Sequence, residues 1–146
     1  LSPERQAKAE ELGAIVVRPE EGETVVEAIH RLTGGGADVS YEVTGVPVVL
    51  GHALAAVHKA GECMVVSIWE REASINPNEF AIQEKSLKGI IAYRHIFPKV
   101  LELMEQGYFP ADKLVTKKIK LENIVEEGFV ELTQDKSQIK ILVEPE

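Results

Sequence analysis

The chain has 146 residues and a formal charge of −8, with 45% hydrophobic and 27% charged residues. These fractions are typical of a globular domain that buries a core, and the acidic balance argues against nucleic-acid and anionic-membrane partners. The chain has no apolar run near the roughly 20 residues that span a bilayer, and no signal peptide is recognised. With a single cysteine, Cys63, it cannot form an internal disulfide, so a reducing, cytoplasmic location is expected.

The chain opens directly on a helix signal. Ser2 is a favourable N-cap, Pro3 suits the first helical turn, and Gly13 is a good terminator. Proteins seldom begin at the first turn of a helix, so we expect the sequence to be a piece of a longer protein.

Apolar runs and helical patterns then alternate along the chain. The runs predict strands at 14–18, 38–43, 64–68 and 87–93. Helical spacing and punctuation by proline and glycine predict helices from Val25 to the Gly34–Gly36 run, from Pro47 to Gly61, after Asn76-Pro77-Asn78, and at 98–106. Strands that alternate with helices and are nearly continuously apolar predict a parallel α/β sheet covered by helices.

The segment after about residue 110 has a different pattern. Residues 114–121 alternate apolar and basic side chains, a helix with Ile124 and Phe129 follows, and 139–143 predicts a last strand. This segment need not belong to the parallel sheet.

Ligands of an open parallel sheet bind beyond the carboxyl ends of its strands. This rule selects three loops, which are Val43-Thr44-Gly45, Ser67-Ile68-Trp69 and the run from Ala92 to His95. Thr44 offers a hydroxyl, and Gly45 lets a ligand approach the backbone. The alternative is that all three are ordinary strand-to-helix connections.

The remaining candidates for chemistry are weaker. We expect His30 to be solvated, and His52 and His58 are six apart, which does not bring two imidazoles together on a helix. Cys63 at the start of a buried strand is expected to be an inert small hydrophobe. The Gly34–Gly36 run ends a helix rather than opening one, so it does not match a dinucleotide fingerprint.

Longer blocks carry a family resemblance. The blocks are SPERQAKAEELGA, LTGGGADVSYEVTG, KAGECMVVSIWE, SLKGIIAYRHIFP, LVTKKIKLENIVEEGF and QIKILVEP. In this order they resemble the zinc-dependent medium-chain alcohol and polyol dehydrogenases, with the 2,3-butanediol branch nearest and the sorbitol branch nearby. The resemblance covers essentially the whole chain.

The resemblance implies a partial Rossmann fold, a doubly wound parallel sheet that lacks its first two strands. Residues 1–110 would complete the nucleotide-binding domain, and residues 111–146 would return to the catalytic domain. In the usual strand order, 3-2-1-4-5-6, residues 14–18 would be the third strand and 38–43 the fourth. These two segments should then not be direct neighbours, since two strand positions lie between them.

The resemblance also implies which residues face the cofactor, NAD. They are Arg5, Thr44, Gly45, Val66, Ser67, Ile68, Ile91, Ala92 and Tyr93. Arg5 would lie near the adenosine end, with a solvated helix arginine as the alternative. The 44–45 loop would pass the ribose and pyrophosphate, residues 66–68 would lie beside the nicotinamide, and residues 91–93 near nicotinamide and substrate.

The implied function is interconversion of a secondary alcohol or diol and its ketone by hydride transfer, assisted in the intact enzyme by zinc. The zinc ligands and the position that separates NAD from NADP are not in this sequence. The sorbitol branch has an arginine where this chain has Ala92, which favours a small apolar diol over a long polyol. The alternative is a non-catalytic oligomerisation or scaffold module.

The predicted strand Leu87–Tyr93 would form the edge of the sheet. It is apolar, it lacks proline, and Lys88 is its only charge. Such an edge favours pairing with another chain, and the family joins two subunits there, so a homodimer or tetramer is expected. The alternative is that the helix at 98–106 or the C-terminal segment covers the edge within one chain.

Overall fold

A computed structural model describes residues 2–145 and divides the chain into two compact units. The first unit is Leu1–Val16 with Tyr93–Glu146, and the second unit is Val17–Ala92. None of the helices within residues 2–145 has the length and apolar character that crossing a bilayer requires. We describe each unit by itself.

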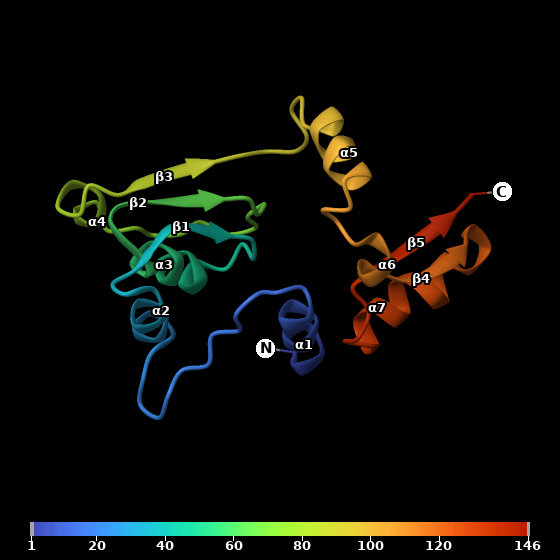
Figure 1. Ribbon diagram of the computed structural model, residues 1–146, viewed down its shortest axis with the longest axis horizontal. Coiled ribbons are helices and arrows are strands. Elements are labelled where there is room, and N and C mark those ends of the chain that lie inside the picture. Colours follow the sequence, from blue (N-terminus) through green and yellow to red (C-terminus); the bar gives the residue numbers. More distant parts are fainter. Residues whose placement is uncertain (1, 146) are drawn as a thin grey trace. The chain divides into compact units, whose positions relative to one another are not determined.

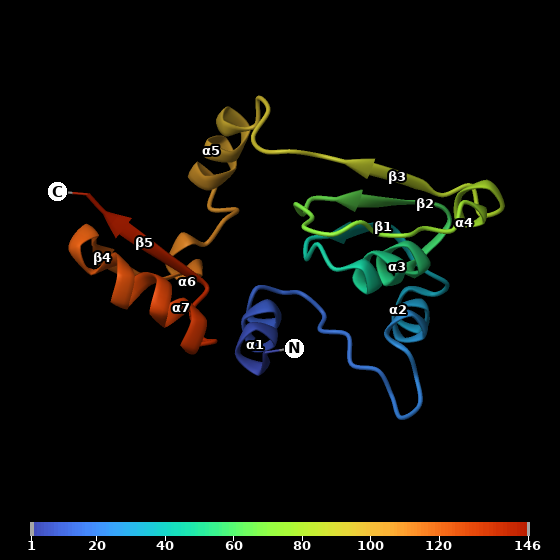
Figure 2. The ribbon, with the colours of Figure 1, turned by 180° about the vertical axis from the view of Figure 1, so that it is seen from behind.

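The second unit contains a three-stranded sheet. In chain order its elements are α2 (Val25–Thr33), β1 (Ala37–Glu42), α3 (Pro47–Ala56), β2 (Val57–Val65), α4 (Asn78–Ala81) and β3 (Ser86–Gly89). The strand order is β1-β2-β3, and both pairings are parallel. Helix α3 lies against this sheet in both ribbon views (Figures 1 and 2). The predicted parallel α/β architecture is therefore confirmed.

The face of the sheet under α3 carries the core of this unit. Leu50 and Leu54 of α3 form a buried cluster with Cys63 of β2. Ser40 of β1 lies opposite Cys63 in the ladder. Its hydroxyl donates a hydrogen bond to the Ala53 carbonyl of α3 at 2.8 Å. The period-two pattern of β1 is confirmed, yet Ser40 is half-buried and Glu42 is buried, whereas Tyr41 is 65% exposed.

The strand expected at 14–18 is wrong. Residues 14–20 have no regular secondary structure, and Ile15 is 80% exposed. An apolar run becomes a strand only where a neighbouring strand satisfies its backbone N–H and C=O groups, and in the described part of the chain no ladder includes this run. Residues 14–18 form no pair with β1, whose ladder partner is β2. Because 14–18 is not a strand here, the structure does not test its predicted place two strand positions from 38–43.

Strand β2 lies earlier in the chain than predicted. Helix α3 ends at Ala56 rather than near Gly61, and β2 ends at Val65 rather than at residue 68. The register of the β1-β2 ladder shifts between Val57 and Glu62, so the residues around Gly61 form a bulge. A Cβ on Gly61 would lie 2.9 Å from the His58 carbonyl oxygen, so a glycine suits this bulge. Strand β3 likewise ends at Gly89 instead of Tyr93.

The first unit contains a separate two-stranded sheet. Its elements are α1 (Pro3–Glu11), α5 (Phe97–Glu105), α6 (Ala111–Leu114), β4 (Val115–Lys120), the 3₁₀ helix η1 (Leu121–Asn123), the π-helix η2 (Ile124–Val130), α7 (Glu131–Gln134) and β5 (Lys140–Glu144). β4 and β5 pair in parallel, and the segment between them crosses back through η2, where Gly128 is buried near Ile119. The predicted change of pattern after residue 110 corresponds to this second sheet.

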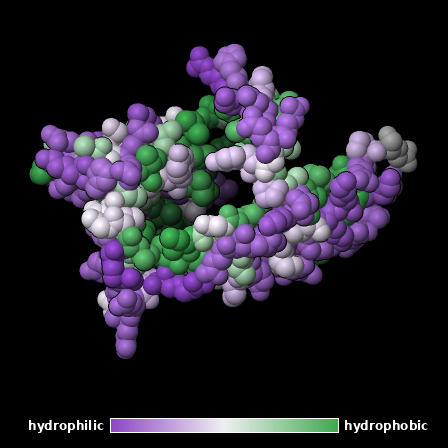
Figure 3. Space-filling model, viewed as in Figure 1, coloured by the Kyte–Doolittle hydropathy of each residue, from purple (hydrophilic) through white to green (hydrophobic). Residues whose placement is uncertain are grey.

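Apolar side chains reach the surface in both units (Figure 3). In the second unit they include Val39 and Tyr41 of β1, and in the first unit Phe97 of α5 and Phe129 of η2. The buried core is correspondingly small and centres on α3 and β2.

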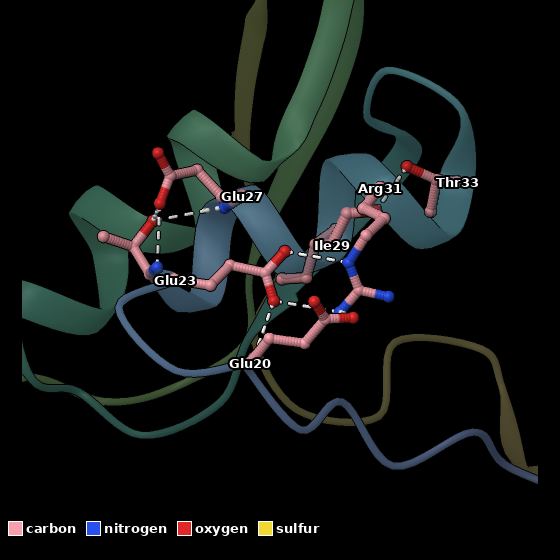
Figure 4. A network of polar contacts seen from close by, with 7 residues as sticks. Glu20, Glu23, Glu27, Ile29, Arg31 and Thr33 are labelled. Carbon is pink, nitrogen blue, oxygen red and sulfur yellow. Dashed lines mark hydrogen bonds and ion pairs between the residues drawn. The ribbon is translucent and has the colours of Figure 1, made fainter.

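An acidic network supports the start of α2 (Figure 4). Arg31 donates from Nε and Nη2 to the two carboxylate oxygens of Glu23, both at 2.9 Å, and its Nη2 lies 3.5 Å from Glu20. These bonds from Arg31, followed by the backbone N–H of Glu20, lower the pKa of Glu23 to about 2. Thr24 and Glu27 complete a capping box.

Because the pKa of Glu23 is lower in the folded state, this network stabilises the fold above the ordinary pKa of 4.5 and is lost as the pH falls toward 2. The Glu23→Gln variant is therefore expected to show a shallower loss of stability between pH 4.5 and 2. Urea unfolding measured across this range gives the slope of the free energy of unfolding against pH. Glu21→Gln is the control for the loss of one nearby carboxylate. Equal slopes for Glu23→Gln and the unmodified protein would contradict the assignment.

Candidate functional site

The carboxyl ends of β1 and β2 meet at one edge of the sheet, because the two strands are parallel. The loops that follow them begin at Val43 and Val66. Beside these loops lies a pocket of about 390 Å³, lined by Thr44, Gly45, Val46, Pro47, Ile68, Glu70 and Arg71. Two of the three loops selected from the sequence therefore share one site.

Glu42, the last residue of β1, organises this edge. Its side chain is buried, with 1% exposure, and its carboxylate accepts hydrogen bonds from both loops. The Thr44 N–H donates at 2.8 Å, the Thr44 hydroxyl at 2.5 Å and the Gly45 N–H at 3.1 Å, and the Ser67 hydroxyl donates from the other loop. Burial alone would raise the pKa of Glu42, but these hydrogen bonds outweigh it and hold the pKa below its ordinary value.

Gly45 lies where the two loops touch. Its φ is +70°, and a Cβ added there would lie 2.8 Å from the carbonyl oxygen of Ile68. A side chain would be strained by the left-handed backbone and would push the second loop away. Glycine thus lets the backbone of one loop pass directly beside that of the other.

The hydroxyl of Thr44 is already engaged in the folded chain. It donates to Glu42 and accepts from the Val46 N–H at 3.2 Å. Its first role is to shape the turn into α3, so the hydroxyl that the sequence offered for a ligand is partly used by the protein itself.

The other candidates are distributed over both units. Val66 and Ile68 follow β2 and are exposed, and the Val66 N–H extends the ladder by donating to the Glu42 carbonyl at 2.9 Å. Ile91 and Ala92 end the second unit and do not line the 390 Å³ pocket. Ala92 has a left-handed φ of +51°.

Arg5 and Tyr93 belong to the first unit. Arg5 is exposed on α1 and lines a pocket of about 290 Å³ with Lys8, Ala9, Leu12, Leu114 and Ile139. The Tyr93 ring packs on Phe97 with centroids 5.4 Å apart. The structure thus brings together Thr44, Gly45, Ser67 and Ile68, with Val66 beside them.

Sequence reasoning missed three charged residues of this site, which are Glu42, Glu70 and Arg71. The strand pattern accounts for Glu42 only as part of a strand, although an acidic residue directly before a Val-Thr-Gly turn has donors within reach of its carboxylate. Glu70 and Arg71 follow the second loop and place one acidic and one basic side chain at the pocket.

Neither a histidine nor the cysteine lines this pocket. The expectation that His30 is solvated is wrong, because its Nε2 lies 2.9 Å from the Ala55 carbonyl and the residue is half-buried where α2 meets α3. His58 pairs with Asp38 at 2.9 Å, which raises the pKa of its imidazole. Within residues 2–145 the structure contains no group of three or more His, Cys, Asp or Glu that could hold a metal. Cys63 is fully buried, as expected of a small hydrophobe.

Comparison with known proteins is consistent with this geometry. Residues 1–106 match the family model described as "Zinc-binding dehydrogenase". The chain is 61% identical over 145 residues to (R,R)-butanediol dehydrogenase of Bacillus subtilis (strain 168), covering 99% of this chain and 42% of the relative. It is 36% identical to (R,R)-butanediol dehydrogenase of Neisseria gonorrhoeae, with the same coverage.

A solved structure agrees over the whole chain. The crystal structure of 2R,3R-butanediol dehydrogenase from Bacillus subtilis matches with a TM-score of 0.94 and 60% identity, covering 100% of this chain and 42% of that one. The chain therefore spans less than half the length of the relatives it matches, and it has the Rossmann-like fold of the corresponding part of them.

Proposed function

Because the chain belongs to the zinc-binding dehydrogenase family, we propose that it forms the cofactor-facing part of an NAD-linked oxidoreductase. The intact enzyme would interconvert a secondary alcohol or diol, similar to 2,3-butanediol, and its ketone. The 61% identity to a butanediol dehydrogenase supports this substrate class. The chain spans 42% of that relative, so the activity is proposed for a protein in which these residues are joined to the remainder of the enzyme.

The observation that carries the proposal is the site formed by the two loops after β1 and β2. A cofactor in this fold binds at the carboxyl edge of the parallel sheet, and the Thr44–Gly45 loop and Ile68 line the 390 Å³ pocket at that edge. In this arrangement the Thr44–Gly45 loop would hold the ribose and pyrophosphate, and residues 66–68 would line the nicotinamide. The nicotinamide, when bound, supplies the acceptor for a hydride.

The outer parts of the cofactor site are assigned by family resemblance. Arg5 would lie at the adenosine end, and Ile91, Ala92 and Tyr93 near the nicotinamide and the substrate. Ala92 stands where the sorbitol branch has an arginine, so one charged donor for a polyol's hydroxyls is missing. A small, mostly apolar diol therefore suits this chain best.

The described residues offer no cluster of three or more His, Cys, Asp or Glu that could hold zinc. In the intact enzyme, zinc would be bound by residues outside this sequence. Residues 1–110 would belong to the nucleotide-binding domain and residues 111–146 to the catalytic domain. The protein would function in the cytoplasm.

The enzyme is proposed to be a homodimer or tetramer that assembles through β3. This strand is the last in the order β1-β2-β3 and presents one edge beyond its pairing with β2. The apolar residues that follow it, Ile90 and Ile91, are exposed. Pairing of two such edges would extend the sheet from one subunit into the next.

Purified as the 146 residues alone, the chain is expected neither to bind NAD tightly nor to oxidise 2,3-butanediol. Pyrophosphate binding in this fold uses a glycine-rich turn at a helix N-terminus, and this sequence contains no such turn before a helix. The longer protein, with a glycine-rich turn and zinc ligands upstream, is expected to reduce NAD with 2,3-butanediol and to be much slower with sorbitol. NADH absorbance measures both.

Turnover by the 146 residues alone would contradict the proposal that pyrophosphate and zinc binding need the longer protein. Failure of the longer protein to oxidise any secondary alcohol with NAD would contradict the proposed activity.

A further inference from the structure

Glu42 is a buried acid that the proposed chemistry leaves without a role. Its side chain is 1% exposed, although the Thr44 that follows it is exposed. A buried carboxylate is costly unless strong hydrogen bonds compensate its lost hydration. Here the donors are the N–H and hydroxyl of Thr44, the N–H of Gly45 and the hydroxyl of Ser67.

These donors come from two separate loops. Thr44 and Gly45 follow β1, whereas Ser67 follows β2 and is 25 residues away in the chain. The backbone of Glu42 strengthens the same link, because its carbonyl accepts from the N–H groups of Val66 at 2.9 Å and Ser67 at 3.4 Å. One residue therefore holds both loops, through its side chain and its main chain.

The carboxylate also fixes the direction of hydrogen bonding at this edge. An ionised carboxylate only accepts hydrogen bonds, so the hydroxyl protons of Thr44 and Ser67 point toward Glu42. The Thr44 oxygen is further occupied by the Val46 N–H. Because the Ser67 proton is used toward Glu42, the Ser67 oxygen can act only as an acceptor toward any further group, so a ligand group that donates a hydrogen bond suits it better than an anion.

We propose that Glu42 is a positioning residue: its buried carboxylate ties the Thr44–Gly45 loop to the Ser67 loop and sets the Ser67 hydroxyl as an acceptor toward the bound cofactor. The cofactor in this statement rests on the proposed NAD-linked function. The tie between the loops does not, since it exists in the protein without any ligand.

The test compares Glu42→Gln with Glu62→Gln in the longer, intact protein. Both changes replace a carboxylate of the same sheet by an amide, but Glu62 is on β2 and pairs with Lys88. The amide of Glu42→Gln adds an NH₂ group that cannot accept from the loops. Amide hydrogen exchange at Thr44 and Gly45 in the cofactor-free protein is expected to accelerate at least about tenfold, and the Kd of NAD to rise at least about tenfold. Glu62→Gln should change neither quantity.

Unchanged exchange at Thr44 and Gly45 in a folded Glu42→Gln protein would overturn the proposal, as would an equal rise in the Kd of NAD for Glu62→Gln. If circular dichroism shows Glu42→Gln to be unfolded, Ser67→Ala decides, because it removes only the tie to the second loop. In that variant faster exchange at Ser67 with a weaker affinity for NAD supports the proposal, and unchanged values overturn it. Should the unmodified protein fail to bind NAD, the proposed function fails, while the exchange measurements still decide whether Glu42 holds the loops.

Discussion

Replacing Gly36 by alanine is expected to lower the free energy of unfolding of the second unit by about 2–6 kcal/mol. Two effects add. The φ of Gly36 is +126°, where an L side chain is strained. In addition, a Cβ would lie 2.6 Å from the backbone nitrogen and 2.9 Å from the Cα of His58. Gly36 directly precedes β1 and faces the start of β2, so the clash would separate the two strands where their pairing begins.

Gly35→Ala is the matched control for this prediction. Its φ of +127° is almost the same, but a Cβ there meets nothing within 4 Å. The control should therefore lose only the strain contribution, about 1–3 kcal/mol. Urea unfolding followed by circular dichroism gives both values. Equal losses for the two variants would show that Gly36 is not in close contact with β2.

The change Ile90→Lys is expected to dissociate the proposed assembly into monomers. Ile90 directly follows β3, is 52% exposed, and donates its N–H to the Val65 carbonyl at 3.1 Å, so its backbone continues alongside β2. A lysine at an exposed sheet edge opposes pairing with a second edge, because its charge would have to be desolvated. Sedimentation velocity of the longer protein at micromolar concentration measures the change.

Ile82→Lys provides the control for this second prediction. Ile82 is 65% exposed and lies just after α4, outside β3. This variant should remain an oligomer, and both variants should retain the helical signal in circular dichroism. An unmodified protein that sediments as a monomer would contradict assembly through β3, as would an Ile90→Lys protein that stays oligomeric.

Elements with local signals were predicted well. Ser2 and Pro3 mark the start of α1, Pro47 marks that of α3, and Gly107 closely follows the end of α5. These signals depend only on residues within one helical turn, so they can be recognised from the sequence alone. The strand expected at 14–18 depended instead on a neighbour to pair with, which an apolar run cannot specify.

The position of the site was predictable, whereas its internal organisation was not. The rule for parallel sheets selected the loops at Thr44 and Ser67, since it needs only the order of strands and helices. The role of Glu42 depends on which face of β1 is covered and on the contact between two loops that are distant in sequence. Pattern analysis assigned the apolar residues of β1 to the strand, but it gave no sign that an acid would be the most buried polar residue.

Because Cys63 is buried, its reactivity can report the local opening of the second unit. The thiol is completely inaccessible between α3 and the sheet, and the sequence contains no other cysteine. A thiol reagent can therefore modify these 146 residues only when this region opens, and where reclosing is faster than labelling, the labelling rate equals the opening equilibrium multiplied by the rate for a free thiolate. Chemical labelling would read the local opening free energy beneath α3 directly, with no dye or engineered residue.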